Sequence, residues 1–323
     1  MHHGAVSREI ASGLLALKTC IEEASIPPSK IDETINIATW NIREFGRVKR
    51  TEAAIHYIAE IINQFDLVAI VELRNNLDDL ARVMKYLGDS WKVIYSDWND
   101  DAGGNYERTA FLYDRRAITH TGLAAEIESQ RLKKGEEWVS EESFWRAPYL
   151  CSFRSGNFDF LALAMHARWG DSILSRQGEL MRFSNWIDRR FKDKYVEDHD
   201  LIVFGDFNTK STENDPLFDA LLSCGLQLPK ALKKLRVGNR VISGSNLNAN
   251  ARYDQILHLP TVEENFTNCG GVIDFFNNGD LVDKLFPGYT KQKFTYQLSD
   301  HFPVWIQIKT DIDTFRLTQI IQN

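Results

Sequence analysis

The 323-residue sequence has few cysteines and lacks any apolar run long enough to cross a bilayer. Its four cysteines, Cys20, Cys151, Cys224 and Cys269, are widely spaced and show no metal-binding spacing, so we expect ordinary buried or surface thiols. The short apolar run at 14–17 is followed by a lysine and does not have the form of a secretory signal peptide. Together these absences favour a soluble, cytoplasmic protein.

The sequence also lacks an excess of positive charge. Lysine and arginine number 38 against 45 aspartate and glutamate residues, which gives a net charge of −7. No overall basic field attracts polyanions, so any contact with nucleic acid must rest on a local basic cluster or on metal ions. Hydrophobic residues make up 43% and charged residues 26%, as is ordinary for a globular enzyme with a large core.

Hydrophobic periodicity predicts strands that alternate with a few helices, without repeats or low-complexity linkers. The predicted strands span 35–41, 67–71, 91–96, 109–113, 149–153, 158–166, 201–205, 252–257 and 302–308. The predicted helices span 7–22, 51–64, 77–87 and 180–191, and 209–250 is expected to be loop-rich with helical pieces. Two packed sheets with outer helices account for this pattern. We therefore predict an α/β fold, a four-layer α/β/β/α sandwich of two mixed β-sheets flanked by helices.

We expect one catalytic domain over 35–309, because the polar candidates for a site are spread from Asn41 to His301 and need both ends of the chain. A helical extension at 1–34 precedes this domain, and a C-terminal tail at 310–323 follows it. The apolar stripe of the first helix could pack on the main body or bind a partner, and packing is the favoured interpretation.

Two polar residues end predicted strands near the N-terminus. Glu72 follows a buried-looking strand, where a charge without a partner is costly. It could be a solvent-facing loop residue, or it could anchor Mg²⁺ or Mn²⁺. Asn41 could supply a neutral oxygen ligand, although asparagine is also common in turns.

The segment Gly205-Asp206-Phe207-Asn208 places two polar side chains two residues apart. In an extended segment both point to the same face. Asp206 could orient the attacking water or take its proton, and Asn208 could hold that water or a phosphoryl oxygen. A plain turn without catalysis is the alternative.

Two histidines have candidate carboxylate partners. His301, in the segment 299–304, could be braced by Asp254, and His166, at the end of a strand, by Glu107. A nearby carboxylate raises the pKa of an imidazole and keeps it charged, which suits donation to a phosphate oxygen. A single histidine is more often structural, but two such pairs beside a metal-type cluster favour cleavage of a phosphate ester.

These residues resemble the endonuclease/exonuclease/phosphatase superfamily, and within it most closely the deoxyribonuclease I-type nucleases. Eight stretches carry the resemblance and occur in the family's order. They are Trp40–Gly46, Val71–Arg74, Tyr106–Arg108, Phe144–Pro148, Ala164–His166, Gly205–Asn208, Tyr253–Ile256 and Ser299–Val304.

The resemblance implies a Mg²⁺- or Mn²⁺-dependent phosphodiesterase, and more narrowly a DNA endonuclease that leaves 3′-hydroxyl and 5′-phosphate ends. Asn41 and Glu72 would bind the metal, and Asp300 would share it. Arg74 and Arg146 fall where deoxyribonucleases place arginines that grip the nucleic-acid backbone. Without the resemblance, each would be taken for a surface arginine.

The resemblance also implies which groups act on the phosphate and the water. These groups are His166 with Glu107, His301 with Asp254, and the pair Asp206 and Asn208. The deoxyribonuclease branch carries a groove-stacking tyrosine two residues before the glutamate, whereas Tyr106 here immediately precedes Glu107. The disulfide-type cysteine spacing of the secreted enzymes is also absent, which fits a reducing compartment.

Two other functions are less consistent with the sequence. A phospholipid or inositol-phosphate phosphoesterase would share the fold and the metal, but such enzymes usually carry tryptophan in the Asp-Asn motif, where this chain has Phe207. They also place cysteine or tryptophan before the late aspartate, where this chain has Tyr253. A non-catalytic binding module is disfavoured, because all candidate ligands and both histidines are present.

Overall fold

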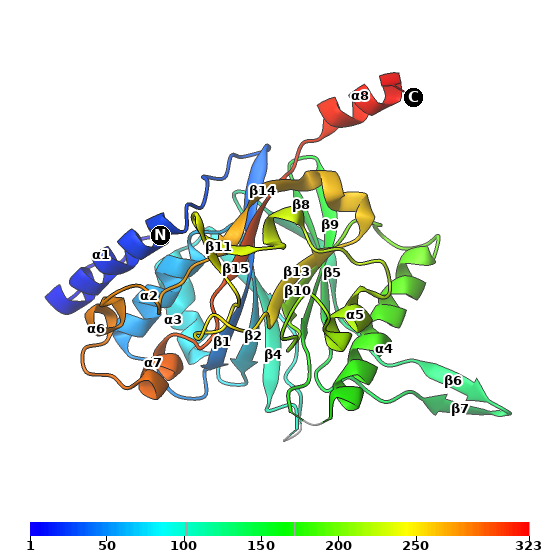
Figure 1. The fold of residues 1–323 in the computed structure, drawn as a ribbon, viewed down its shortest axis with the longest axis horizontal. Helices are drawn as coiled ribbons and strands as arrows, with labels where there is room; N and C mark the ends of the chain where they lie inside the picture. Colours follow the sequence, from blue (N-terminus) through cyan, green and yellow to red (C-terminus); the bar gives the residue numbers. More distant parts are fainter. Residues whose placement is uncertain (101–102, 171, 323) are drawn as a thin grey trace.

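Two mixed β-sheets pack face to face at the centre of the protein (Figure 1). The computed structural model describes residues 1–100, 103–170 and 172–322. In spatial order, the six-stranded sheet contains β14 (Phe266–Val272), β15 (Val304–Lys309), β1 (Thr34–Phe45), β2 (Leu67–Arg74), β4 (Glu107–Asp114) and β3 (Trp91–Tyr95). The five-stranded sheet contains β13 (Asp254–His258), β10 (Leu201–Asp206), β9 (Phe158–His166), β8 (Tyr149–Ser155) and β5 (Thr119–Glu126). The pairs β1–β2 and β9–β10 are parallel, and the other neighbours are antiparallel.

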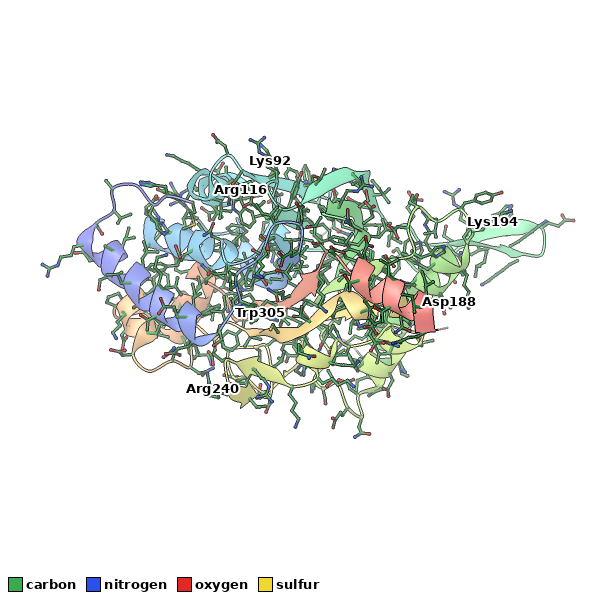
Figure 2. All side chains as sticks on the ribbon, turned by 90° about the horizontal axis from the view of Figure 1, so that it is seen from above. Lys92, Arg116, Asp188, Lys194, Arg240 and Trp305 are labelled. Carbon is green, nitrogen blue, oxygen red and sulfur yellow. The ribbon has the colours of Figure 1, made fainter. Side chains whose placement is uncertain are left out.

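Helices cover both outer faces of this double sheet, which confirms the predicted four-layer sandwich. The helices are α1 (Arg8–Glu23), α2 (Glu52–Ile62), α3 (Asp78–Leu87), α4 (Ile173–Lys192), α5 (Pro216–Leu222), α6 (Leu281–Leu285), α7 (Lys291–Gln297) and α8 (Asp313–Gln322), with 3-10 turns η1 (Lys230–Leu232) and η2 (Pro260–Asn265). Two small hairpins complete the fold, β6 (Arg131–Lys134) with β7 (Glu137–Ser140) and β11 (Leu235–Val237) with β12 (Arg240–Ile242). Figure 2 shows α1 at one end of the molecule and the β6–β7 hairpin at the opposite end.

Alternate side chains of β9 pack into two different hydrophobic clusters, one on each face of its sheet. Leu163 and Met165 belong to the core cluster beneath α4 and α5, whereas Ala162 and Ala164 belong to the cluster that includes the other sheet. Successive side chains of a strand point to opposite faces, so His166 continues the inner row of alanines. The strand therefore delivers an imidazole to the space between the sheets at its carboxyl end.

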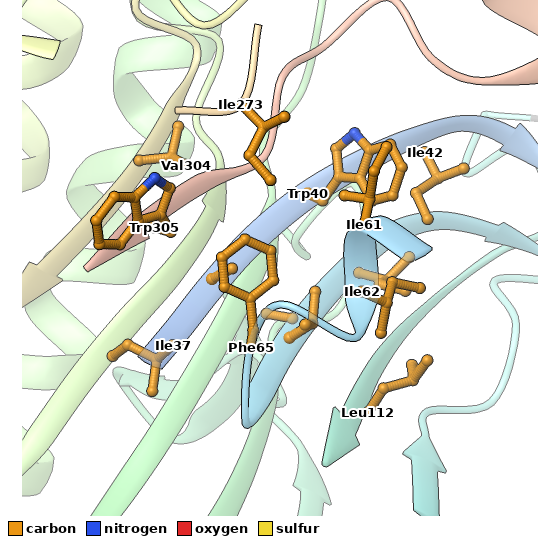
Figure 3. Packing of buried hydrophobic residues seen from close by; sticks show 14 of the residues in the cluster. Ile37, Trp40, Ile42, Ile61, Ile62, Phe65, Leu112, Ile273, Val304 and Trp305 are labelled. Atoms are coloured by element: carbon orange, nitrogen blue, oxygen red, sulfur yellow. The ribbon is translucent and has the colours of Figure 1, made fainter. Parts of the chain in front are cut away.

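Helix α2 packs on the outer face of the six-stranded sheet. Ile61 of α2, and Phe65 just beyond it, belong to the same buried cluster as Trp40 of β1 (Figure 3). Trp40 is fully buried, and its indole Nε1 donates a hydrogen bond of 2.9 Å to the carbonyl oxygen of His301. The core around β1 therefore also fixes the loop that carries a candidate catalytic histidine.

Helix α1 packs on α2 and α6. Leu14 and Leu17 are buried in the main core, so the apolar stripe of α1 packs on the main body, which is the favoured of the two roles expected from the sequence. A Cβ atom at Gly13 would lie 1.9 Å from the hydroxyl oxygen of Tyr57, which shows how closely the two helices approach. The division into an extension, a catalytic domain and a tail stays a prediction.

Several elements were not predicted, and their sequences explain why. β5 and the β6–β7 hairpin are mostly exposed, and β14 carries Gly270 and Gly271, so none has the apolar alternation of a buried strand. α8, within the predicted tail, exposes Leu317 and Ile320. Among the described residues, no helix combines the length and hydrophobicity needed to cross a bilayer.

β9 and β10 approach so closely at Gly205 that the position has no room for a side chain. Its φ is +142°, and a Cβ atom there would lie 1.9 Å from the carbonyl oxygen of Met165. We expect Gly205→Ala to lower the free energy of unfolding by more than about 2 kcal/mol, because the strands must separate to admit the methyl group. Urea denaturation followed by circular dichroism measures this loss.

Gly225→Ala is the matched control. Gly225 also has a positive φ, +92°, but nothing lies within 4 Å of the added Cβ position. Gly225→Ala should therefore lower the free energy of unfolding by only roughly 1 kcal/mol, which is the cost of the left-handed backbone conformation for alanine. Equal losses in the two variants would contradict the close approach of the strands.

Candidate active site

The candidate site lies where the parallel strands of both sheets end. Asn41 of β1 donates hydrogen bonds from Nδ2 to Glu72 Oε1 at 2.9 Å and to Asp206 Oδ2 at 3.0 Å. Glu72 lies in β2 of the same sheet, two residues before the strand ends at Arg74, whereas Asp206 is the last residue of β10 in the other sheet. One amide group therefore joins the two sheets at this edge.

Glu72 sits on a strained piece of backbone. Its φ is +61°, a left-handed conformation that is costly for a residue with a side chain, and the pairing of β2 with β4 shifts register here. The backbone amide of Glu44 donates to Glu72 Oε2 at 2.8 Å and holds the carboxylate in place. Strain of this kind persists where the surrounding structure fixes a side chain for a purpose.

The first histidine pair is formed by His166 and Glu107. Nδ1 of His166 lies 2.7 Å from Glu107 Oε2, and both side chains are buried. Burial raises the pKa of Glu107, but His166, Arg146 and Arg74 outweigh it and lower that pKa to about 2. Burial and Arg146 lower the pKa of His166, yet the Glu107 and Asp206 carboxylates raise it above its ordinary value.

The second pair is formed by His301 and Asp254. Nδ1 of His301 lies 2.8 Å from Asp254 Oδ2, and the hydroxyl of Ser245 donates to the same oxygen at 2.6 Å. Burial lowers the pKa of His301, but the Asp254 and Asp206 carboxylates hold it well above its ordinary value. Burial raises the pKa of Asp254.

Asp206 lies between the two imidazoles. Its Oδ2 atom is 3.8 Å from Nε2 of His166 and 3.8 Å from Nδ1 of His301. Its Oδ1 atom accepts a hydrogen bond of 2.9 Å from the backbone amide of Asn208. The Asn208 side chain donates from Nδ2 to the carbonyl oxygen of Ala167 at 2.8 Å, which fixes its amide beside the strand ends.

Arg74 and Arg146 are turned toward Glu107. Nε of Arg146 lies 2.7 Å from Glu107 Oε2, and Nη1 of Arg74 lies 3.5 Å from Oε1. Both arginines are buried, with 6% and 8% of their surface exposed, respectively. In this arrangement they support the carboxylate beside His166, and a direct grip on a phosphate remains a prediction.

Asp300 immediately precedes His301 in the chain; 38% of its side chain is exposed, and Arg43 Nη1 lies 3.6 Å from its Oδ2. Burial raises the pKa of its carboxyl, and so does the negative charge of Glu72. Asn41 thus contacts Glu72 directly, and Asp300 lies close enough for the charge of Glu72 to raise its pKa.

Two serines that sequence reasoning missed organise the site. Ser299 Oγ donates to the carbonyl oxygen of Asn41 at 2.6 Å and accepts from the backbone amide of His301 at 3.0 Å. Ser299 lies inside a recognised motif, so its position was a usable signal. Ser245 lies in a stretch predicted only as loop, and nothing in its local sequence points to Asp254.

The donor atoms fit a hard divalent cation such as Mg²⁺ or Mn²⁺. Asn41 Oδ1 is buried and has no hydrogen-bond partner, although a buried polar oxygen normally has one. It lies on the same side chain that contacts Glu72, and carboxylate and amide oxygens are the ligands these ions prefer. A second group of possible ligand atoms belongs to Asp206, Asp254 and His301, and these atoms lie within 4.8 Å of one another.

The chain is similar to deoxyribonucleases in sequence. A deoxyribonuclease from Thioalkalivibrio sp. (strain K90mix) is 31% identical over 194 residues, which cover 56% of this chain and 48% of the relative. Deoxyribonuclease-1 from Bos taurus is 24% identical over 181 residues, which cover 54% of this chain and 61% of the relative. The chain thus spans about half the length of the curated relatives it matches.

A solved structure shows the same fold at low identity. The catalytic domain of human nocturnin, with bound sulfate, has a TM-score of 0.53 at 13% identity and covers 87% of this chain and 96% of its own. The model of the endonuclease/exonuclease/phosphatase family matches residues 38–301, from β1 to the second candidate histidine. Because this match covers most of the sequence, the chain belongs to the endonuclease/exonuclease/phosphatase family.

Proposed function

We propose that the chain is a divalent-metal-dependent phosphodiesterase that cleaves DNA internally and leaves 3′-hydroxyl and 5′-phosphate ends. The observation that carries this proposal is the placement of Asp206 3.8 Å from both imidazoles, each held by its own carboxylate. The similarity to two deoxyribonucleases supports DNA as the substrate.

Asn41, Glu72 and Asp300 would hold the cation. When bound, Mg²⁺ or Mn²⁺ supplies positive charge that offsets the charge developing on the phosphate oxygens. The free Oδ1 atom of Asn41 and the proximity of Glu72 to Asp300 support this ligand set. We prefer it to the group around Asp254, because Asp254 Oδ2 is already engaged by His301 and Ser245.

The protein's own groups would divide the proton transfers and the charge stabilisation. Asp206 would orient the attacking water and accept its proton, since its carboxylate lies at the centre of the site. His166 and His301, kept protonated by their carboxylate partners, would donate hydrogen bonds to the phosphate and a proton to the leaving oxygen. Asn208 would position the water or a phosphate oxygen.

The first experiment is a nicking assay on supercoiled plasmid. We expect cleavage in Mg²⁺ or Mn²⁺, complete loss with EDTA, and a fall of about 10³-fold or more in His166→Ala, because a charged donor is removed. His120→Ala is a matched control, since His120 lies in the exposed strand β5 and its Nε2 lies 3.0 Å from the Leu123 carbonyl oxygen.

The same preparations should be given inositol phosphates and phospholipids. Intact plasmid together with rapid release of phosphate from an inositol phosphate would contradict the nuclease proposal and support a phospholipid or inositol-phosphate phosphoesterase. Absence of activity on every phosphodiester and monoester tested, with normal folding, would favour a binding module.

The pH dependence provides a separate test of the second histidine pair. The imidazolium of His301 is the active form, so activity should be retained below its raised pKa and lost as pH rises through it. Asp254→Asn removes the main charge that raises this pKa. We therefore expect the alkaline limb of the pH–rate profile to move to lower pH, because burial then dominates.

Ser245→Ala is the control for that profile. It removes a hydrogen bond to Asp254 but leaves the carboxylate charge in place. The alkaline limb should therefore move less than in Asp254→Asn. If the alkaline limb of the pH–rate profile stayed unchanged in Asp254→Asn, a group other than His301 would be responsible for that limb.

A further inference from the structure

The hairpin of β6 and β7, here named the arm, projects from the protein beyond α4 (Figure 1 and Figure 2). Its strands pair antiparallel, and all side chains from 131 to 140 are exposed. A two-stranded ribbon without a hydrophobic face to pack on is only marginally stable in water. The arm is therefore a feature that the core does not require.

The two faces of the arm differ in chemistry. Residues directly paired across a hairpin share a face, so Lys133 lies beside its partner Trp138, and Arg131 follows two positions away on the same side. The opposite face carries the Leu132–Val139 pair and Lys134, which is paired with an acidic residue. The first face thus combines two cations with an indole, and neither strand places a carboxylate on it.

Trp138 is 68% exposed, which is unusual for so large an apolar ring. Exposed aromatic rings interleaved with arginine and lysine are typical of surfaces that track a nucleic-acid backbone and stack on bases. Because the whole chain carries a net charge of −7, attraction to a polyanion has to come from such local basic faces.

The base of the arm is anchored near the candidate site. Glu142, just after β7, pairs with Arg182 of α4 at 3.0 Å. Four residues further along the chain, Arg146 contacts Glu107, which holds His166. The arm is thus joined to the site by one short, anchored segment.

We propose that the arm is a second nucleic-acid contact outside the cleavage site. Arg131 and Lys133 bind backbone phosphates, and Trp138 stacks on an exposed base or sugar. The proposal rests on the proposed function, since it assigns the arm to the same substrate. It also explains how an acidic protein can retain a long polyanion while the site acts on one phosphate.

The test compares two variants that differ only in the face they alter. The first combines Arg131→Ala, Lys133→Ala and Trp138→Ala, and the second combines Lys134→Ala and Val139→Ala on the opposite face. Binding to a long DNA duplex is measured in EDTA by fluorescence anisotropy over a range of salt concentrations. Hydrolysis of bis(p-nitrophenyl) phosphate is measured in parallel with Mg²⁺ or Mn²⁺.

We expect the first variant to bind DNA about tenfold more weakly than the unmodified protein. The slope of log affinity against log salt should fall by roughly two, because the variant lacks two cations that neutralise phosphates. The second variant should stay within about twofold of the unmodified protein. Hydrolysis of the small diester should be unchanged in both, because it does not reach the arm.

Three results would overturn the proposal. Equal affinity and salt slope in all proteins, with plasmid still nicked, would remove the arm from substrate binding and leave the proposed function intact. Loss of binding to phosphatidylserine vesicles in the first variant, with DNA binding unchanged, would assign the arm to membranes. Hydrolysis of the small diester by a protein that neither binds nor nicks DNA would overturn both proposals.

Discussion

The amide group of Asn41 connects the two β-sheets at the edge where their parallel strands end. Its hydrogen bonds reach Glu72 in one sheet and Asp206 in the other, so the relative position of the sheets fixes the distance between these carboxylates. Stacked sheets lie about 10 Å apart, and side chains from both inner faces can meet only between them. The site therefore exists only while the two sheets remain packed.

Burying charged groups between the two sheets costs free energy, because the groups lose their contact with water. Glu107, His166, Asp254 and His301 are all strongly shielded from water, and each depends on a partner of opposite charge. Replacing such buried pairs by apolar residues is often neutral or stabilising. The core thus gives up stability to keep ionised groups in place, which is the pattern expected of a functional centre.

Sequence reasoning succeeded where local pattern and tertiary structure agree. The strand predicted at 158–166 coincides with β9, and His166 is its last residue, as predicted. It failed for β14, whose glycines resemble a loop, and for Ser245, which reaches its partner only through the fold. The orientation of Arg74 and Arg146 toward Glu107 likewise depends on neighbours distant in the chain.

The left-handed backbone at Glu72 limits which residues can occupy that position. Valine, isoleucine and threonine are poorly tolerated at a φ of +61°, whereas asparagine, aspartate and glycine adopt it at lower cost. The position is therefore constrained twice, by the charge that the side chain presents and by the left-handed conformation of the main chain. A variant that lacks the carboxylate would still need a residue compatible with that conformation to keep β2 aligned with its neighbours.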